Sequence, residues 1–158
     1  GLRMQATPLQ MALAAAAIGQ GATVAPRLLL ELDGRAATQP APEKLAVRLD
    51  RVRAGMKGVI DQGTAAAAFR GLPRQVRAGL YGKTGTAPTG DTGKDGDKGG
   101  SDSATVWFTG WIEPGSLPGQ RHRLAFAVYV SHSEGSGGDH AAPAVAALLG
   151  GLSGQRRE

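Results

Sequence analysis

The chain opens on a strong helical pattern. The stretch "TPLQMALAAAAIGQG" places leucines and alanines on one helical stripe. Thr7 can act as the N-cap, Pro8 suits the first helical position, and Gln10 stands where a capping box has Glu or Gln. We therefore predict a helix over residues 8–18, ended by the glycines that follow it.

The pattern is weaker between residues 23 and 69. The predicted elements are an extended segment at 23–32 broken by a proline, a loop at 33–43, a short edge strand at 44–49, a helix capped by Asp50 and closed at Gly63, and a further helical turn at 64–69. Within the helix, apolar residues at 52, 56, 59 and 60 recur at helical spacing, which predicts one buried stripe.

The second half changes to the period of a strand. Residues 76–87, 103–113 and 122–132 are rich in Val, Thr and aromatic residues and are bounded by Gly, Pro and Asp clusters. The third segment is apolar on both faces, which predicts a central strand, and the short connections predict antiparallel neighbours. A last helix is expected over "DHAAPAVAALLGGL", stopped by Gly150 and Gly151.

These elements predict an α/β fold of the α+β type, with antiparallel strands covered by helices. We expect one domain over residues 1–152 and a flexible tail over 153–158. The chain has 158 residues and does not start with Met, so we expect it to be a piece of a longer protein. It contains no apolar run of the ~18 residues that a membrane span needs, and as given we expect it to be soluble.

Composition removes several function classes. The chain has no cysteine, which excludes disulfides and thiolate metal sites. Its net charge of +5 is scattered, and aromatic residues make up 4%, so we expect solvated surface charge and no nucleic-acid partner. Oxygen-rich residues at 91–102 fit a calcium loop poorly, and His132, Glu134, Asp139 and His140 are a weak metal set. We predict no metal and no cofactor.

The cluster "LYGKTGTAPTG", residues 80–90, holds the candidate chemistry. A phosphate-binding P-loop would need a glycine at position 77, where Arg stands, and a helix starting at Lys83, which the following glycines and proline prevent. A P-loop nucleotide binder is therefore a remote alternative.

A strand carrying these residues suits a peptide carboxylate better. Lys83 supplies positive charge, Thr84 and Thr86 supply hydroxyls, and Gly85 lets a peptide backbone approach like an added strand. Strict alternation puts Lys83 opposite Thr84, so edge geometry or a bulge would have to bring both toward one ligand.

"KTGTA" at 83–87 resembles the third signature of penicillin-binding protein transpeptidases and serine β-lactamases. The neighbouring segments resemble the same family in the same order over roughly residues 3–150: "ATPLQMALAAAAIGQGATVAPRLL", "GMKGVIDQGTA", "VWFTGWIEP", "LAFAVYVSH" and "HAAPAVAALL". The TPLQ wording is most similar to class B members, and the resemblance covers the C-terminal part of such a domain.

The resemblance implies a D,D-transpeptidase that cross-links peptidoglycan stem peptides through a serine acyl-enzyme and is acylated by β-lactams. Lys83 would assist proton transfer, Thr84 and Thr86 would hold the ligand carboxylate, and Gly85 would line the substrate strand. The Thr86 N–H would be one oxyanion donor. The family further implies a membrane-anchored parent at the extracytoplasmic or periplasmic face, in a cell-wall complex serving cell shape or division.

The nucleophile signature S-x-x-K is missing. The serines of the chain lack a Lys three residues later; they are Ser101, Ser103, Ser116, Ser131, Ser133, Ser136 and Ser153. S-x-N cannot exist because the chain has no Asn. We therefore expect this chain alone to be inactive, and a non-catalytic penicillin-recognising or peptidoglycan-binding module stays as the alternative. Exposed strand edges also predict a homodimer.

Overall fold

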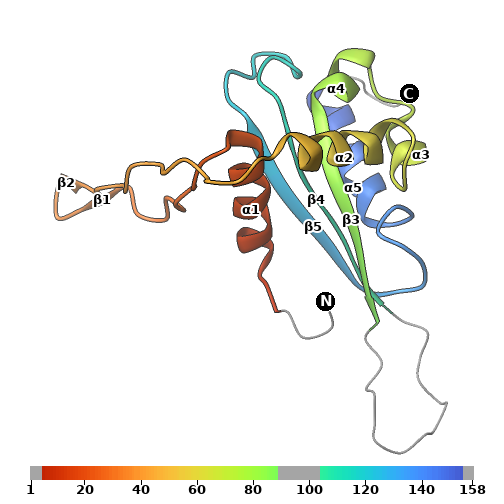
Figure 1. The fold of residues 1–158 in the computed structure, drawn as a ribbon, viewed down its shortest axis with the longest axis horizontal. Helices are drawn as coiled ribbons and strands as arrows, with labels where there is room; N and C mark the ends of the chain where they lie inside the picture. The colour runs from red at the N-terminus through yellow and green to blue at the C-terminus, as the bar shows by residue number, and fades with distance from the viewer. Residues whose placement is uncertain (1–4, 89–103, 155–158) are drawn as a thin grey trace, which may run out of the picture.

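The computed structural model describes residues 5–88 and 104–154 (Figure 1). Its elements follow in the order α1 (Pro8–Gln20), β1 (Glu31–Leu32), β2 (Arg35–Ala36), α2 (Asp50–Asp61), α3 (Ala66–Phe69), α4 (Arg74–Gly79), β3 (Leu80–Pro88), β4 (Ala104–Ile112), β5 (Leu124–Ser133) and α5 (Ala141–Leu152). Helices and an antiparallel sheet confirm the predicted α+β class. No helix in the described ranges is long and apolar enough to cross a membrane.

The main sheet has the order β3-β4-β5, and both pairings are antiparallel. β3 and β4 pair in unbroken register from Leu80 opposite Ile112 to Pro88 opposite Ala104. The register of β4 and β5 shifts once, between Ala104 and Val106. The irregularity of the sheet therefore lies between β4 and β5, and the pairing of β3 is regular.

Each face of the sheet packs on its own helices. On one face, Phe108 is fully buried against Phe69 of α3, and Val145 and Leu149 of α5 join the same core cluster. On the opposite face, Trp111 is fully buried with Ala15 of α1 and Met56 of α2. We call these the α5 face and the α1 face. Figure 1 shows α1 and α5 on either side of the strands.

The start of α1 is confirmed in detail. Gln10 N donates to Thr7 Oγ1 at 3.2 Å, and Thr7 N donates to Gln10 Oε1 at 2.8 Å, which completes a capping box. The helix runs to Gln20, two residues beyond the prediction, and ends at Gly21 with φ 78°. That left-handed conformation favours glycine, and it explains the stop.

Several predictions for the middle of the chain are wrong. The expected edge strand at 44–49 is replaced by a single bridge from Lys44 to Ala22. The expected loop at 33–43 contains β2, which forms a hairpin with β1. Asp50 is the first residue of α2 rather than its cap, and no side chain caps that helix. Short alternating patterns without a core to cover them are weak predictors, because packing decides such segments.

The second half corrects three further predictions. Residues 74–79 form α4 rather than the start of a strand. β5 is an edge strand of the described sheet, and the central strand is β4, which pairs with both β3 and β5. α5 continues through Gly150 and Gly151 to Leu152. Packing of α5 on the core therefore outweighs the low helix propensity of two glycines.

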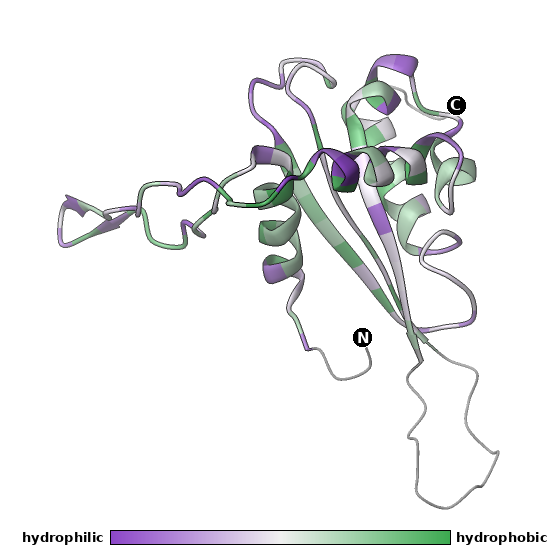
Figure 2. Ribbon diagram, in the orientation of Figure 1, coloured by the Kyte–Doolittle hydropathy of each residue, from purple (hydrophilic) through white to green (hydrophobic). Residues whose placement is uncertain are grey.

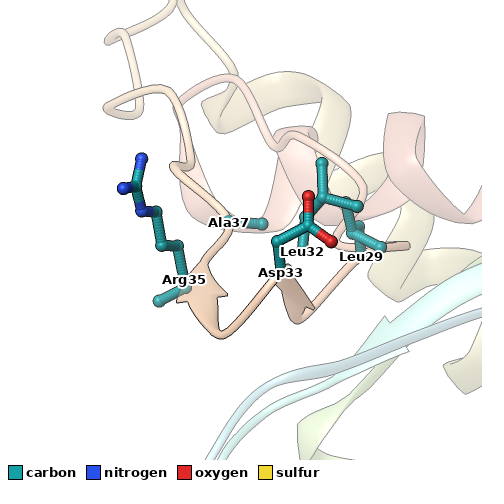
Figure 3. A pocket seen from close by; sticks show the side chains of 6 residues that line it. Leu29, Leu32, Asp33, Arg35 and Ala37 are labelled. Atoms are coloured by element: carbon teal, nitrogen blue, oxygen red, sulfur yellow. The ribbon is translucent and has the colours of Figure 1, made fainter.

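Residues 22–48 form an arm that leaves the body beside α1 and carries the β1–β2 hairpin at its end (Figure 1). Its leucines are largely solvent-exposed: Leu28 80%, Leu30 64% and Leu32 62%. Figure 2 shows hydrophobic and hydrophilic stretches alternating along this arm. Leu29, Leu32, Asp33, Arg35 and Ala37 line an open hollow at the hairpin (Figure 3).

Candidate functional site

The predicted site residues lie on β3, at an edge of the sheet. β3 pairs with β4 on one side, and within the described residues no strand pairs with its other side. Lys83, Thr84, Gly85 and Thr86 occupy the middle of this strand. The segment is extended, as predicted, and it is neither helical nor sealed inside the core.

The direction of the backbone groups follows from one hydrogen bond. Glu113 N donates to Gly79 O at 2.9 Å, one step beyond the register of Leu80 with Ile112. In an antiparallel pair, hydrogen-bonded and non-bonded residue pairs alternate. Counting from Gly79, the backbone groups of Lys83 and Gly85 point toward β4. Those of Thr84 and Thr86 point outward, so this edge presents the C=O of Thr84 and the N–H of Thr86 on the side away from β4.

The Lys83 side chain leaves β3 on the α1 face of the sheet. Its cross-strand partner is Thr109, whose hydroxyl donates to Met11 O of α1 at 3.2 Å. The Lys83 side chain is exposed, and its Nζ donates to Thr84 O at 2.8 Å. Since that carbonyl points outward, the lysine side chain turns around the strand and places its ammonium at the free edge. No bulge in β3 is required.

The two threonine hydroxyls lie on the α5 face. Thr84 Oγ1 lies 2.9 Å from Thr64 Oγ1, in the turn between α2 and α3, and either oxygen can be the donor. Thr86 Oγ1 accepts from Gly137 N at 3.4 Å. Lys83 and the threonines therefore approach one edge from opposite faces of the sheet.

A glycine turn supports the α5 face of β3. A Cβ atom on Gly137 would collide with Trp107 O and lie 2.8 Å from Gly85 O, and one on Gly138 would collide with Thr64 O. The turn therefore contacts the backbone of β3, β4 and the Thr64 segment at distances that a side chain would prevent. Ala142 N donates to Gly137 O at 2.9 Å, which joins the turn to α5.

Asp139 fixes the shape of the same turn. Its Oδ2 accepts from Ser136 Oγ at 2.7 Å and from Ser136 N at 3.0 Å. The Ser136 hydroxyl, then the Ser136 backbone N–H, and to a smaller extent the charge of His140 lower the pKa of the Asp139 carboxyl. The carboxylate is thus held ionised as a structural group of the turn.

The weak metal set does not assemble. The Asp139 carboxylate accepts a hydrogen bond from the Ser136 hydroxyl, and His140 Nε2 contacts the backbone oxygen of Glu134 at 2.8 Å. Across residues 5–88 and 104–154, no three His, Asp or Glu side chains gather in a way that could hold a metal ion. The candidate calcium loop at 91–102 lies outside the described residues. The hollow of Figure 3 is on the arm and contains none of the β3 residues.

Sequence reasoning identified Lys83, Thr84, Gly85 and Thr86 but assigned no role to the residues behind them. Thr64 belongs to the "QGTA" stretch noted for its resemblance, and Gly137–Gly138 is a visible glycine pair. Sequence separation hides their contacts with β3, because they lie 20 and 51 residues from the threonines that they touch.

Such an edge can hold an extended ligand with a terminal anion. The outward Thr84 C=O and Thr86 N–H can pair with a peptide backbone, while the Lys83 ammonium and the threonine hydroxyls can bind a carboxylate. None of the serines that the structure describes belongs to an S-x-x-K signature, since Ser116, Ser131, Ser133, Ser136 and Ser153 have no Lys three residues later.

Comparison with known proteins agrees with this geometry. The family model for the penicillin binding protein transpeptidase domain matches residues 1–150. A search of curated proteins found no significant match, and neither did a search of solved structures. Members of the matched family act in general on peptidoglycan, bind β-lactams and work outside the cytoplasm. With the match covering nearly the whole chain, the protein belongs to the penicillin-binding protein family of peptidoglycan transpeptidases.

Proposed function

We propose that residues 1–152 are the C-terminal part of a serine-type D,D-transpeptidase domain whose substrate strand docks on β3. The observation that carries the proposal is the edge itself. Thr84 O and Thr86 N–H point outward by register, and the Lys83 ammonium lies at the same edge. These three groups are therefore presented together at the free edge of one strand.

The ligand would lie along β3 as an added antiparallel strand. Its terminal carboxylate would meet the hydroxyls of Thr84 and Thr86, with the Lys83 charge nearby. Charge-assisted hydrogen bonds of this kind are roughly twice as strong as neutral ones. The Thr86 N–H would face the carbonyl oxygen under attack, where losing one donor costs about 3 kcal/mol of transition-state stabilisation.

The chemistry would be acyl transfer. A serine hydroxyl would attack the carbonyl of the penultimate D-Ala, its proton would pass to a neighbouring base, and the terminal D-Ala would leave as the amine. An amine of a second stem peptide would then take the acyl group and release the serine. Lys83 would assist through its charge and its proton. The serine and the S-x-N motif would come from the segment that precedes this chain in a membrane-anchored, extracytoplasmic parent.

Labelling by a fluorescent penicillin tests this proposal. We expect the natural polypeptide that carries this chain to form a stable adduct at a serine outside the 158 residues. We expect the chain alone to form none. An adduct on the isolated chain would overturn its predicted inactivity, and an unlabelled natural polypeptide would overturn the transpeptidase assignment.

One observation favours a second candidate, a non-catalytic penicillin-recognising or peptidoglycan-binding module. The chain carries neither S-x-x-K nor any Asn for S-x-N. Reading the open reading frame upstream separates the two. Both motifs upstream would support the enzyme, whereas their absence would support the binding module.

A further inference from the structure

We propose that Thr64, packed against the Gly137–Gly138 turn, is a positioning residue that sets the Thr84 hydroxyl to donate toward a ligand carboxylate, while the Gly137 N–H does the same for the Thr86 hydroxyl. The inference rests on the proposed function and goes beyond it, because it assigns a role to residues that do not touch the ligand. Its starting point is the hydroxyl pair of Thr64 and Thr84, 2.9 Å apart on the α5 face.

A hydroxyl has one hydrogen to donate, so the direction of this pair matters. If Thr84 donates to Thr64, its hydrogen is unavailable to an anion. If Thr64 donates to Thr84, the Thr84 hydrogen is free, and its oxygen is polarised by the incoming bond. A carboxylate at the edge accepts hydrogen bonds and cannot donate them, so it selects the second arrangement. The result is a chain of donors running from Thr64 through Thr84 to the ligand.

The Thr86 hydroxyl is also left free to donate toward the ligand. The Gly137 N–H can only donate, so at 3.4 Å it takes the Thr86 oxygen as acceptor and leaves the Thr86 hydrogen for the ligand. Both hydroxyls are thus supported from the α5 face by groups that are off the strand. A free threonine on an exposed edge would instead distribute its hydroxyl among several rotamers.

The glycine turn holds the two supports together. The close approach of Gly138 to Thr64 O and of Gly137 to Gly85 O leaves no room for side chains. The Thr64 segment, the turn and β3 therefore form one packed unit. A shift of the turn would move Thr64 and the Gly137 N–H at the same time.

Two ligands that differ in one group test the role of Thr64. The natural polypeptide is reacted with benzylpenicillin, which carries the carboxylate, and with its methyl ester, which does not. Thr64→Val keeps the side-chain shape and removes the hydroxyl. We expect it to lower the second-order acylation rate for benzylpenicillin about three- to tenfold, the size of one neutral hydrogen bond, and to change the rate for the ester less than about twofold.

Thr64→Ser restores the hydroxyl and should restore the benzylpenicillin rate to within about twofold of the wild-type value. Thr38→Val is the matched control, because Thr38 is an exposed threonine on the arm, and it should change neither rate. A Thr64→Val variant that slows both ligands equally, or slows neither, overturns the positioning role while the transpeptidase assignment stands. A wild-type polypeptide that reacts with neither ligand overturns the proposed function and this inference with it.

Discussion

The Lys83 Nζ atom lies 2.8 Å from the carbonyl oxygen of Thr84, which points away from β4 at the free edge of the sheet. The lysine therefore approaches the edge from the α1 face, while the hydroxyls of Thr84 and Thr86 approach it from the α5 face. A cation and two hydroxyls converge on one edge without any distortion of the strand. This arrangement explains how alternating residues can serve a single ligand.

Removing the Lys83 charge should slow acylation while leaving the stability of the fold nearly unchanged. Since Lys83 is exposed, we expect Lys83→Met to change the free energy of unfolding of the chain by less than about 0.5 kcal/mol. In the natural polypeptide it should slow acylation by benzylpenicillin at least about tenfold, because a charged hydrogen bond contributes about 1.5–3 kcal/mol.

Lys44→Met is the control for that experiment, since Lys44 is an exposed lysine on the arm. Urea denaturation followed by circular dichroism measures the first quantity, and labelling kinetics measure the second. Equal acylation rates for the Lys83→Met and Lys44→Met variants would contradict the role of Lys83.

The glycine turn predicts a contrast between two Gly→Ala substitutions. Gly137→Ala would push a Cβ atom into Trp107 O, so we expect destabilisation of about 1–3 kcal/mol, as in overpacked sites. Gly151 lies within α5, where an added Cβ would meet nothing within 4 Å, so Gly151→Ala should stabilise by up to about 1 kcal/mol through helix propensity. Chemical denaturation measures both, and a neutral Gly137→Ala would refute the close packing.

The turn should also respond to acid through Asp139. The pKa of the Asp139 carboxyl is lowered in the folded chain. Its hydrogen bonds to Ser136 therefore contribute stability at pH values above 3.8, the ordinary pKa of this group. That contribution is lost as the pH falls through the lower, folded value. An NMR titration should show the Asp139 carboxyl and the Ser136 amide shifting together below pH 3.8. Asp139→Asn should abolish this transition, and a transition that persists in the variant would contradict the assignment.

The sheet edges predict self-association. β5 is an edge strand of the described sheet, and Leu124 and Tyr129 on it are 44% and 50% exposed. Unpaired edges with apolar side chains invite pairing with another copy, and an edge lysine prevents it. We expect light scattering to show concentration-dependent dimers of the chain and Leu124→Lys to weaken them. A wild-type chain that stays monomeric at high concentration would count against this prediction.

Local signals in the sequence were enough for α1 and for the class of the fold. Thr7, Pro8 and Gln10 act on one another within a single turn, so the capping box could be predicted without knowledge of the rest of the chain. The strands carrying Lys83, Phe108 and Phe126 were found because β-branched and aromatic residues gather in them. The site residues on β3 followed from the same local pattern and from the resemblance of "KTGTA".

Tertiary structure decided the strand order, the helix at residues 74–79 and the continuation of α5 through Gly150 and Gly151. It alone brought Thr64 and Gly137 to the α5 face of β3 and turned Lys83 toward the edge. The physical reason is the distance along the sequence over which each kind of interaction acts. Capping and strand preference depend on neighbours within a few residues, whereas these contacts join segments that only the packing of a common core brings together.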